Sequence, residues 1–265
     1  FLLMVCLYIV FLEINNFNSL GVLFDINFKL KKGEILGIAG LVGSKRTELA
    51  KTIFGLLQKD SGTMSIDGKE VTIKNPRDAI SNGIGYIPED RKVEGLFPDL
   101  NVAQNTSITN LDEIIKIGVL RKKIRLNRVF DQLKNLGFKK RDILKDAKNL
   151  SGGNQQKVVI GKWFWTNAKI MIFDEPTRGI DVGAKQDIYK KINELAKNGY
   201  SIIFISSELP EVLNMSDRLL VMREGRIVAE FLCDPYPPLQ EDVLSAMFAG
   251  KNASDETVST GVINE

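Results

Sequence analysis

Two stretches decide the fold: LSGGNQQK at residues 150–157 and KIMIFDEPTRGID at residues 169–181. The second begins with an apolar, β-rich run at 169–173, which is typical of a strand covered on both faces in a parallel sheet. Asp174 and Glu175 follow directly, so they stand at the carboxyl end of that strand, where α/β sheets bind ligands. An isolated Asp-Glu pair could merely cap a turn, but the two strings together indicate a site.

The two carboxylates suit different tasks. Asp174 can orient a Mg²⁺ ion, often through water, because a hard cation on phosphates takes oxygen ligands and keeps much of its hydration. Glu175 is then free to position or deprotonate an attacking water. We therefore predict Asp174 and Glu175 as the catalytic pair of a nucleotide site.

The LSGG string predicts an anion-binding helix terminus. A serine and two glycines at 151–153 open a predicted helix that runs through Trp165. The unpaired backbone N–H groups and the positive dipole end of such a helix face outward, and glycine removes the Cβ that would block a phosphate. Ser-Gly-Gly alone is more often a loop, so the inference depends on the complete LSGGNQQK string.

A phosphate loop is predicted upstream of both strings. The sequence reads as a strand (EILGIA, 34–39), a loop (GLVGSKRT, 40–47) and a helix with apolar Leu49, Ile53 and Leu56. An ordinary βα turn containing glycine is the simpler alternative. The candidate nucleotide-binding residues of this loop are Gly40, Leu41, Val42, Gly43, Ser44, Lys45, Arg46, Thr47 and Glu48.

This loop is degenerate. Against the pattern GxxxxGK(S/T), Lys45 occupies the second glycine position and Arg46 the lysine position. The planar arginine fork is not equivalent to a compact ammonium at a tight phosphate site. If the loop keeps its usual shape, Lys45 must adopt a backbone conformation natural to glycine, which costs about 1 kcal/mol or more. Nucleotide binding would then depend on the backbone and Thr47.

Residues 12–250 resemble the second nucleotide-binding half of the tandem ATPase subunits of bacterial monosaccharide ABC importers, the ribose, galactose and xylose group. The resemblance rests on the ordered strings EILGIAGLVG, PRDAI, GYIPEDRK, LSGGNQQK, DEPTRGIDVGAK and SSELPEV. It implies an α/β fold: a P-loop NTPase core of the RecA-like, ABC type with an antiparallel β subdomain and an inserted helical subdomain. It also implies an ATPase with ATP and Mg²⁺ as cofactors.

The resemblance also implies partners and a location. In this family two ATPase halves of one chain close head to tail over two ATP molecules and drive two membrane permease subunits. A periplasmic sugar-binding protein feeds the permease. The expected location is therefore cytoplasmic, on the inner face of the bacterial plasma membrane. The permease and binding protein choose the sugar, so this sequence does not distinguish ribose from galactose or xylose.

Site residues carry over one by one. Thr47 and Asp174 match Mg²⁺ ligands, and Asp181 matches the D-loop. Glu89 stands at the Q-loop glutamine position, which senses Mg²⁺ and meets the permease interface. Ser207 stands at the switch histidine position, and the chain contains no histidine. Phe17 is a candidate for stacking on adenine, with a core position at a strand edge as the alternative.

Head-to-tail closure predicts a division of labour. Because the LSGG helix of one half faces the ATP of the other, these residues serve the partner's site, whereas the degenerate loop, Glu89 and Ser207 belong to this half's own site. That site is expected to hydrolyse ATP slowly. The predicted partner-site motif comprises Ser151, Gly152, Gly153, Asn154 and Gln155.

Two alternatives remain open from the sequence. One is a structural nucleotide-binding half without turnover. The other is an ABC ATPase acting on nucleic acid or ribosomes, which the dense Lys and Arg residues between 116 and 148 favour. Such a run is more often a solvated helix face, a net charge of +3 is small, and no aromatic residues interleave it. We therefore expect no nucleic-acid partner.

Length and composition predict one large domain. The chain has 265 residues, of which 44% are hydrophobic and 26% charged, enough for a substantial core. Cys6 and Cys233 have no metal or redox spacing, which fits a reducing compartment. The apolar run 1–12 is shorter than the ~20 residues that cross a bilayer, and we interpret it as a linker or foreign leader. The nucleotide-binding domain is predicted over 13–250, with a helical arm at about 94–150 and a flexible tail at 251–265.

Further elements complete the predicted α/β order. Strand signals at 22–30, 63–66 and 71–73 indicate an antiparallel region, with 10–14 in its first strand. Helical spacing covers 124–136 and 184–197, and 202–205 and 219–222 read as further core strands. The βαβ succession predicts a mainly parallel sheet.

Overall fold

A six-stranded sheet forms the centre of the computed structural model, which describes residues 9–116 and 119–249. The strand order is β12-β11-β3-β10-β9-β6, and all neighbours are parallel except the edge pair β11 and β12. This confirms the predicted, mainly parallel sheet. Its strands are β3 (Ile35–Gly40), β6 (Ile84–Ile87), β9 (Ile170–Asp174), β10 (Ser201–Ile205), β11 (Arg218–Arg223) and β12 (Arg226–Leu232).

The inner strands are continuous apolar runs because helices cover both faces of the sheet. Every residue of β3, β6, β9 and β10 is buried. In β12, by contrast, exposed and half-buried residues alternate, as expected for an edge strand with one face toward solvent. The elements predicted from the sequence do not include β6 or β12.

A second, antiparallel sheet has the strand order β2-β1-β4-β5, which confirms the predicted antiparallel region. The first strand begins at Val10, so the end of the expected leader belongs to the domain: Leu12 is fully buried. Residues 1–8 and the expected tail at 251–265 lie outside the described residues. The strands are β1 (Val10–Ser19), β2 (Leu23–Lys31), β4 (Ser61–Ile66) and β5 (Lys69–Val71).

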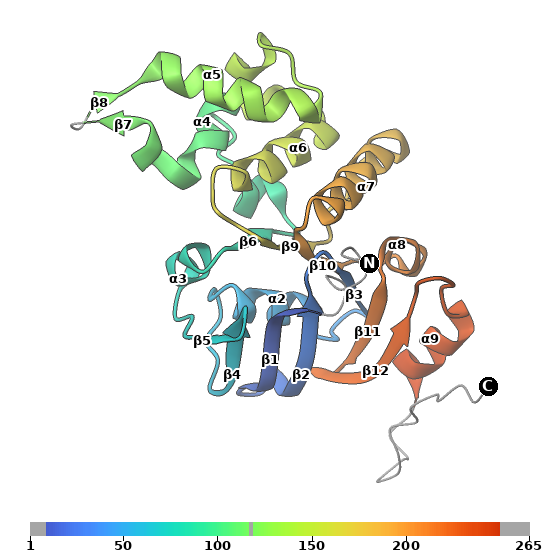
Figure 1. Ribbon diagram of the computed structural model, residues 1–265. Coiled ribbons are helices and arrows are strands. Elements are labelled where there is room, and N and C mark those ends of the chain that lie inside the picture. The colour runs from blue at the N-terminus through green and yellow to red at the C-terminus, as the bar shows by residue number, and fades with distance from the viewer. Residues whose placement is uncertain (1–8, 117–118, 250–265) are drawn as a thin grey trace.

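A helical arm stands apart from the two sheets (Figure 1). In it α6 packs against α4 and α5, so the arm extends past the predicted boundary at 150. A short hairpin, β7 (Ile115–Lys116) and β8 (Val119–Leu120), was not predicted. The helices of the arm are α4 (Val102–Ser107), α5 (Lys122–Leu133) and α6 (Gly152–Trp163), with 3₁₀ turns η2 (Ile108–Glu113), η3 (Lys134–Leu136), η4 (Asp142–Leu144) and η5 (Ala147–Asn149).

The remaining helices flank the sheets, and α7 lies between the arm and the parallel sheet (Figure 1). Asp181 caps α7, whose apolar stripe at 188, 192 and 195 is buried as the spacing predicted. The helix after β3 ends before Leu56, which is 49% exposed, so only Leu49 and Ile53 of the expected apolar face are buried. These elements are α2 (Arg46–Ile53), α3 (Pro76–Ser81), α7 (Val182–Lys197), α8 (Leu209–Met215), α9 (Gln240–Phe248) and a π-helical turn, η1 (Arg91–Gly95).

Within the described ranges, no helix combines the length and apolar character needed to span a bilayer.

Candidate functional site

Three loops meet at the carboxyl ends of neighbouring strands β3, β10 and β9. Ile205 pairs with both Ile38 of β3 and Asp174 of β9, so β9 and β10 end at one level and β3 continues two residues further, to Gly40. The phosphate loop follows β3, Glu175 follows β9, and Ser207 follows β10. The topology thus brings together the loop, the acidic pair and the switch position that the sequence placed far apart.

The phosphate loop keeps its usual backbone shape, although Lys45 stands at a position that glycine normally occupies. Lys45 has φ 77° and ψ 24°, the left-handed conformation expected for the missing glycine. Its ammonium lies 3.0 Å from Glu48 Oε1, along the surface of α2. At Gly40 an added Cβ would lie 2.4 Å from the Met222 carbonyl oxygen, so a residue with a side chain does not fit there. The predicted backbone strain at Lys45 is confirmed.

Thr47 and Asp174 come together beneath this loop. The Thr47 hydroxyl donates to Asp174 Oδ1 at 3.1 Å, and the Tyr86 hydroxyl donates to Oδ2 at 3.0 Å. Asp174 is fully buried, and burial raises its carboxyl pKa to about 6 against the hydrogen bonds that lower it. Burial and the neighbouring Asp174 also raise the pKa of Tyr86, so this phenol is a neutral donor.

The oxygen donors fit a hydrated Mg²⁺ ion on a phosphate chain. Thr47 Oγ1 and Asp174 Oδ1 are hard oxygen ligands placed side by side at the end of the loop. The Ser44 hydroxyl in the same loop is buried without a hydrogen-bond partner in the described part of the chain. A buried hydroxyl without a partner carries a desolvation cost, which a phosphate oxygen in the loop would remove.

Arg46 points toward the acidic loop. Its Nη1 donates to the Ser206 carbonyl at 3.0 Å, and its Nη2 lies 3.8 Å from Glu175 Oε1. Burial lowers the pKa of the Arg46 guanidinium, while the two acids oppose this shift. The arginine at the lysine position therefore forms part of the contact between the β3 and β10 loops.

Glu175 is held by strand β10. Its φ is 48°, an uncommon value for a residue with a side chain, and its N–H donates to the Ile205 carbonyl at 2.9 Å. The Ser207 hydroxyl donates to Glu175 Oε2 at 3.1 Å. The switch position and the candidate base are thus in direct contact, without a histidine.

The LSGG residues form a separate site on the arm. Ser151 caps α6, with its hydroxyl accepting from the Asn154 N–H at 3.4 Å. An added Cβ at Gly153 would lie 2.6 Å from the Ala184 Cβ, so this glycine allows α6 to pack on α7. Within the described ranges, no hydrogen bond joins residues 151–155 to the phosphate loop. Ser151 and Asn154 are exposed.

Other predicted residues lie elsewhere. Glu89 forms an ion pair with Arg178, and Asp181 accepts from the Ala184 N–H at 2.9 Å as the cap of α7. The adenine-stacking prediction for Phe17 is wrong, because its side chain is 1% exposed in an inner strand and leaves no open ring face. Lys59 covers the ring at 5.4 Å from its centroid. The alternative, a core phenylalanine, is what the structure has.

Sequence reasoning missed three residues with contacts in these sites: Tyr86, Arg91 and Ser206. Tyr86 and Arg91 flank Glu89 in the GYIPEDRK string, and Ser206 precedes the switch position. The only signal in the sequence was a polar residue beside each motif. The direction of such a side chain depends on partners that lie far away in the sequence. These three residues supplement the predicted motif residues and replace none of them.

Comparison with known families matches residues 23–178 to the family described as ABC transporter. The ribose import ATP-binding protein RbsA of Oceanobacillus iheyensis is 47% identical over 221 residues, which cover 83% of this chain and 45% of that protein. The xylose import ATP-binding protein XylG of Geobacillus kaustophilus is 47% identical over 231 residues, covering 87% of this chain and 45% of that protein. The chain thus spans about half the length of the curated relatives it matches.

Solved structures agree on the fold. An ATP-binding cassette of an ABC transporter in its ADP conformation superimposes with a TM-score of 0.74 at 26% identity, covering 90% of this chain and 94% of that one. A nucleotide-free cassette gives a TM-score of 0.74 at 24% identity, covering 91% and 96%. The predicted P-loop NTPase fold of the ABC type is confirmed.

Proposed function

The chain belongs to the ABC transporter family, and from this membership we propose that it is the second nucleotide-binding half of a tandem subunit that energises bacterial monosaccharide import. The names of the relatives support the substrate class, because they include ribose and xylose import ATP-binding proteins. Coverage of about half of each relative supports the tandem arrangement. The domain covers residues 13–250, with Val10–Leu12 added by the first strand.

One observation carries the nucleotide-binding part: Thr47 Oγ1, in the last residue of the phosphate loop, lies 3.1 Å from Asp174 Oδ1. The backbone N–H groups of residues 40–47 and the start of α2 bind the phosphates of ATP. Thr47 and Asp174 hold the Mg²⁺ ion, which when bound neutralises charge on those phosphates. Glu175, fixed by the Ser207 hydroxyl, orients the attacking water.

This half's own site is slow. Arg46 lies 3.8 Å from Glu175 Oε1 and donates to the Ser206 carbonyl, so its charge is directed at the acidic loop as well as at the phosphates. The planar arginine fork is not equivalent to the compact lysine ammonium at a tight phosphate site. Ser207 supplies one hydroxyl where a histidine would provide a ring with a second nitrogen. The main contribution of this half is therefore its LSGG helix, offered to the facing half.

The surface proposed to contact the permease lies between the nucleotide core and the arm. A hollow of about 420 Å³ is lined there by Leu56, Leu57 and Trp163, among others, and the Lys51–Glu94 ion pair borders it at 2.9 Å. Leu56 and Leu57 are 49% and 38% exposed, which supports docking of an apolar segment. A cytoplasmic segment of one permease subunit fits this hollow, and such docking places the chain at the inner face of the membrane.

A second candidate is a half that binds nucleotide without turnover. The Arg46–Glu175 contact favours it, because the arginine of the loop lies 3.8 Å from the carboxylate that would otherwise orient the attacking water. Calorimetric titration of this chain with Mg-ATP tests nucleotide binding, and phosphate release from the chain and from the tandem subunit tests turnover. The first proposal expects binding by the chain, slow release by the chain alone and sugar-stimulated release by the assembly with its permease. Absence of Mg-ATP binding would refute both candidates.

A further inference from the structure

The GYIPEDRK segment contacts two sites at once. After Glu89, Asp90 caps the π-helical turn η1 by accepting from the N–H groups of Lys92 and Val93 at 2.9 and 3.1 Å. This cap fixes the backbone from which Arg91 extends. π-helical turns are rare and often occur at functional sites. The segment therefore presents Arg91 in a defined direction.

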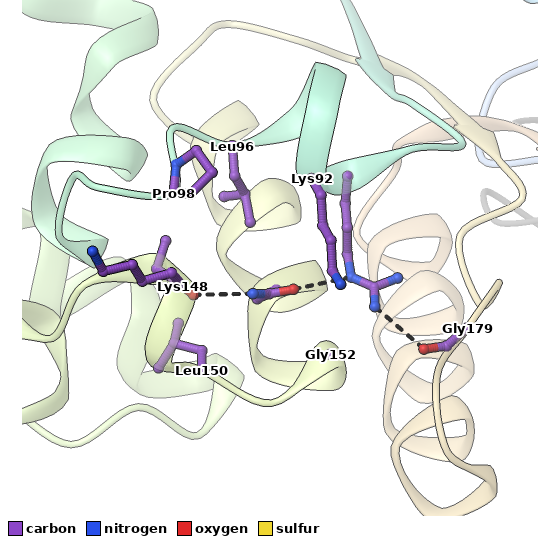
Figure 2. A pocket seen from close by; sticks show the side chains of 10 residues that line it. Lys92, Leu96, Pro98, Lys148, Leu150, Gly152 and Gly179 are labelled. Atoms are coloured by element: carbon purple, nitrogen blue, oxygen red, sulfur yellow. Dashed lines mark hydrogen bonds between the residues drawn. The ribbon is translucent and has the colours of Figure 1, made fainter.

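Arg91 joins the loop after the acidic pair to the LSGG helix. Its Nη1 donates to the Arg178 carbonyl at 2.8 Å, and its Nη2 donates to the Gly179 carbonyl at 3.2 Å. Its Nε donates to Gln155 Oε1 at 3.4 Å (Figure 2). One guanidinium thus binds two carbonyls near Asp181 and one side chain of α6.

The contact continues to the glycine-led end of α6 and into the arm. An added Cβ at Gly152 would lie 2.8 Å from Arg91 Nη2, so the guanidinium packs against the start of the helix. Gln155 is 7% exposed, and its Nε2 donates to the Ala147 carbonyl at 3.0 Å. The dashed lines in Figure 2 follow this path from Gly179 across the cavity of about 480 Å³ to the arm.

We infer that Arg91 is a positioning residue that fixes the LSGG helix against the loop at 178–181, so that both meet the facing half as one surface. The inference rests on the proposed function, in which Ser151 and its neighbours serve the facing half. The planar fork is needed because three donors in fixed directions reach acceptors on two elements. A lysine has one rotatable ammonium and cannot bind both carbonyls and Gln155 with this geometry.

Lys92 provides the matched control. It follows Arg91 in the same turn, lines the same cavity and carries the same charge, but its ammonium has no hydrogen-bond or ion-pair partner among the described residues. Arg91→Ala, Arg91→Lys and Lys92→Ala are compared in the tandem subunit by steady-state ATPase assays. A displacement of about 1 Å at a reacting site costs up to ~100-fold in rate.

We therefore expect Arg91→Ala to lower kcat about 10- to 100-fold and Arg91→Lys to lower it about as much, with KM for ATP changed less than about threefold. Lys92→Ala stays within about twofold. Mg-ATP affinity of this chain alone, which reports on its own phosphate loop, stays unchanged in all three. An equal loss of kcat in Lys92→Ala, or full recovery in Arg91→Lys, would overturn the positioning role.

Amide hydrogen exchange of this chain without nucleotide gives a readout that does not depend on the proposed function. In Arg91→Ala the amides of residues 151–155 and 179–181 should exchange faster, while those of 44–47 keep wild-type rates. Uniformly faster exchange would mean a general loss of stability and would overturn the inference. Unchanged exchange at 151–155 would do the same. If the wild-type tandem subunit has no ATPase activity, the proposed function fails and the exchange experiment still decides the contact.

Discussion

The phosphate loop and the LSGG helix are both glycine-containing turns that lead into helices, yet they differ in how their polar groups are used. In the loop, Arg46 and Ser207 are directed at Glu175, and Lys45 accepts a strained φ of 77°. At the helix, Ser151 is exposed and Gly153 packs without strain on α7. In the loop the altered side chains meet Glu175 within one site, whereas the start of α6 keeps an exposed polar group. A shared pattern of glycine, turn and helix therefore does not determine where the polar groups of a motif are directed, which depends on the strands and helices packed around it.

The largest expected effect separates the two regions directly. Ser151→Ala in the tandem subunit removes a hydroxyl that the proposal aims at the facing half's ATP, and the loss of one such donor costs about 100-fold in kcat. Glu175→Gln in the same subunit should lower kcat less than about fivefold, because the proposed function assigns little of the turnover to this half's own site. Phosphate release under saturating ATP measures both variants.

Ser151→Thr is the control for this pair, since it keeps a capping hydroxyl and should retain most of the activity. The comparison breaks if Glu175→Gln proves more harmful than Ser151→Ala. In that case the own site carries the turnover in spite of Arg46 and Ser207.

The next effect concerns the buried acid, which has no counterpart at the LSGG helix. Burial raises the Asp174 pKa from 3.8 to about 6, so the folded chain binds this proton more tightly than the unfolded chain does. Stability from this group is therefore present at low pH and is lost as pH rises through about 4 to 6. Asp174→Asn has no carboxyl group to ionise, so it avoids this loss. The free energy of unfolding of the variant, minus that of the wild type, should therefore rise by about 1 kcal/mol between pH 5 and pH 8.

Urea unfolding of this chain without metal or nucleotide measures this gain. Ser151→Ala, which changes no titratable group, should show a stability difference independent of pH. A gain for Asp174→Asn that stays constant across this range would show that the carboxylate is not strained by burial. Mg-ATP should bind more weakly to Asp174→Asn at every pH, because a hard oxygen ligand is lost.

Arg46→Lys tests whether the arginine is the cause of the altered loop. A lysine is shorter and compact, so it should leave the Ser206 carbonyl, now bound at 3.0 Å, and turn toward the phosphates. We expect the Mg-ATP affinity of this chain to rise by about threefold to tenfold. Arg46→Gln serves as the control and should lose affinity. Tighter binding by the wild type than by Arg46→Lys would make the arginine a phosphate ligand in its own right.

Three motif positions could be located from the sequence because each follows a buried strand: the phosphate loop after β3, the acidic pair after β9 and Ser207 after β10. A continuous apolar run such as 170–173 marks its own carboxyl end, so Asp174 and Glu175 could be located without coordinates. Strands β6 and β12 were not predicted. The first is only four residues long and contains a glycine, and in the second, an edge strand, exposed and half-buried residues alternate. Phe17 was misjudged because an aromatic residue in a strand has the same sequence appearance in a core as beside a ligand.

Contacts between motifs could not be predicted. The partners of Arg46, the Ser206 carbonyl and the Glu175 carboxylate, depend on β3 and β10 lying next to each other in the sheet. Arg91 likewise meets Gly179 and Gln155 only when the arm and the core are both folded. The sequence gives the chemical group of each residue but not the direction of its side chain. That direction is what distinguishes the phosphate loop from the start of α6.

The smallest expected effect isolates the backbone of the phosphate loop. Lys45→Gly relieves a left-handed φ that costs a residue with a side chain about 1 kcal/mol, whereas Lys45→Ala keeps that φ. Both variants lose the ion pair with Glu48, which is partly exposed and worth a few tenths of a kcal/mol. The difference between them is therefore the strain, less the about 0.4–1 kcal/mol by which glycine favours the unfolded chain. Urea unfolding should find Lys45→Gly at least as stable as Lys45→Ala, and a lower stability for the glycine variant would mean that the loop relaxes away from the glycine-like conformation.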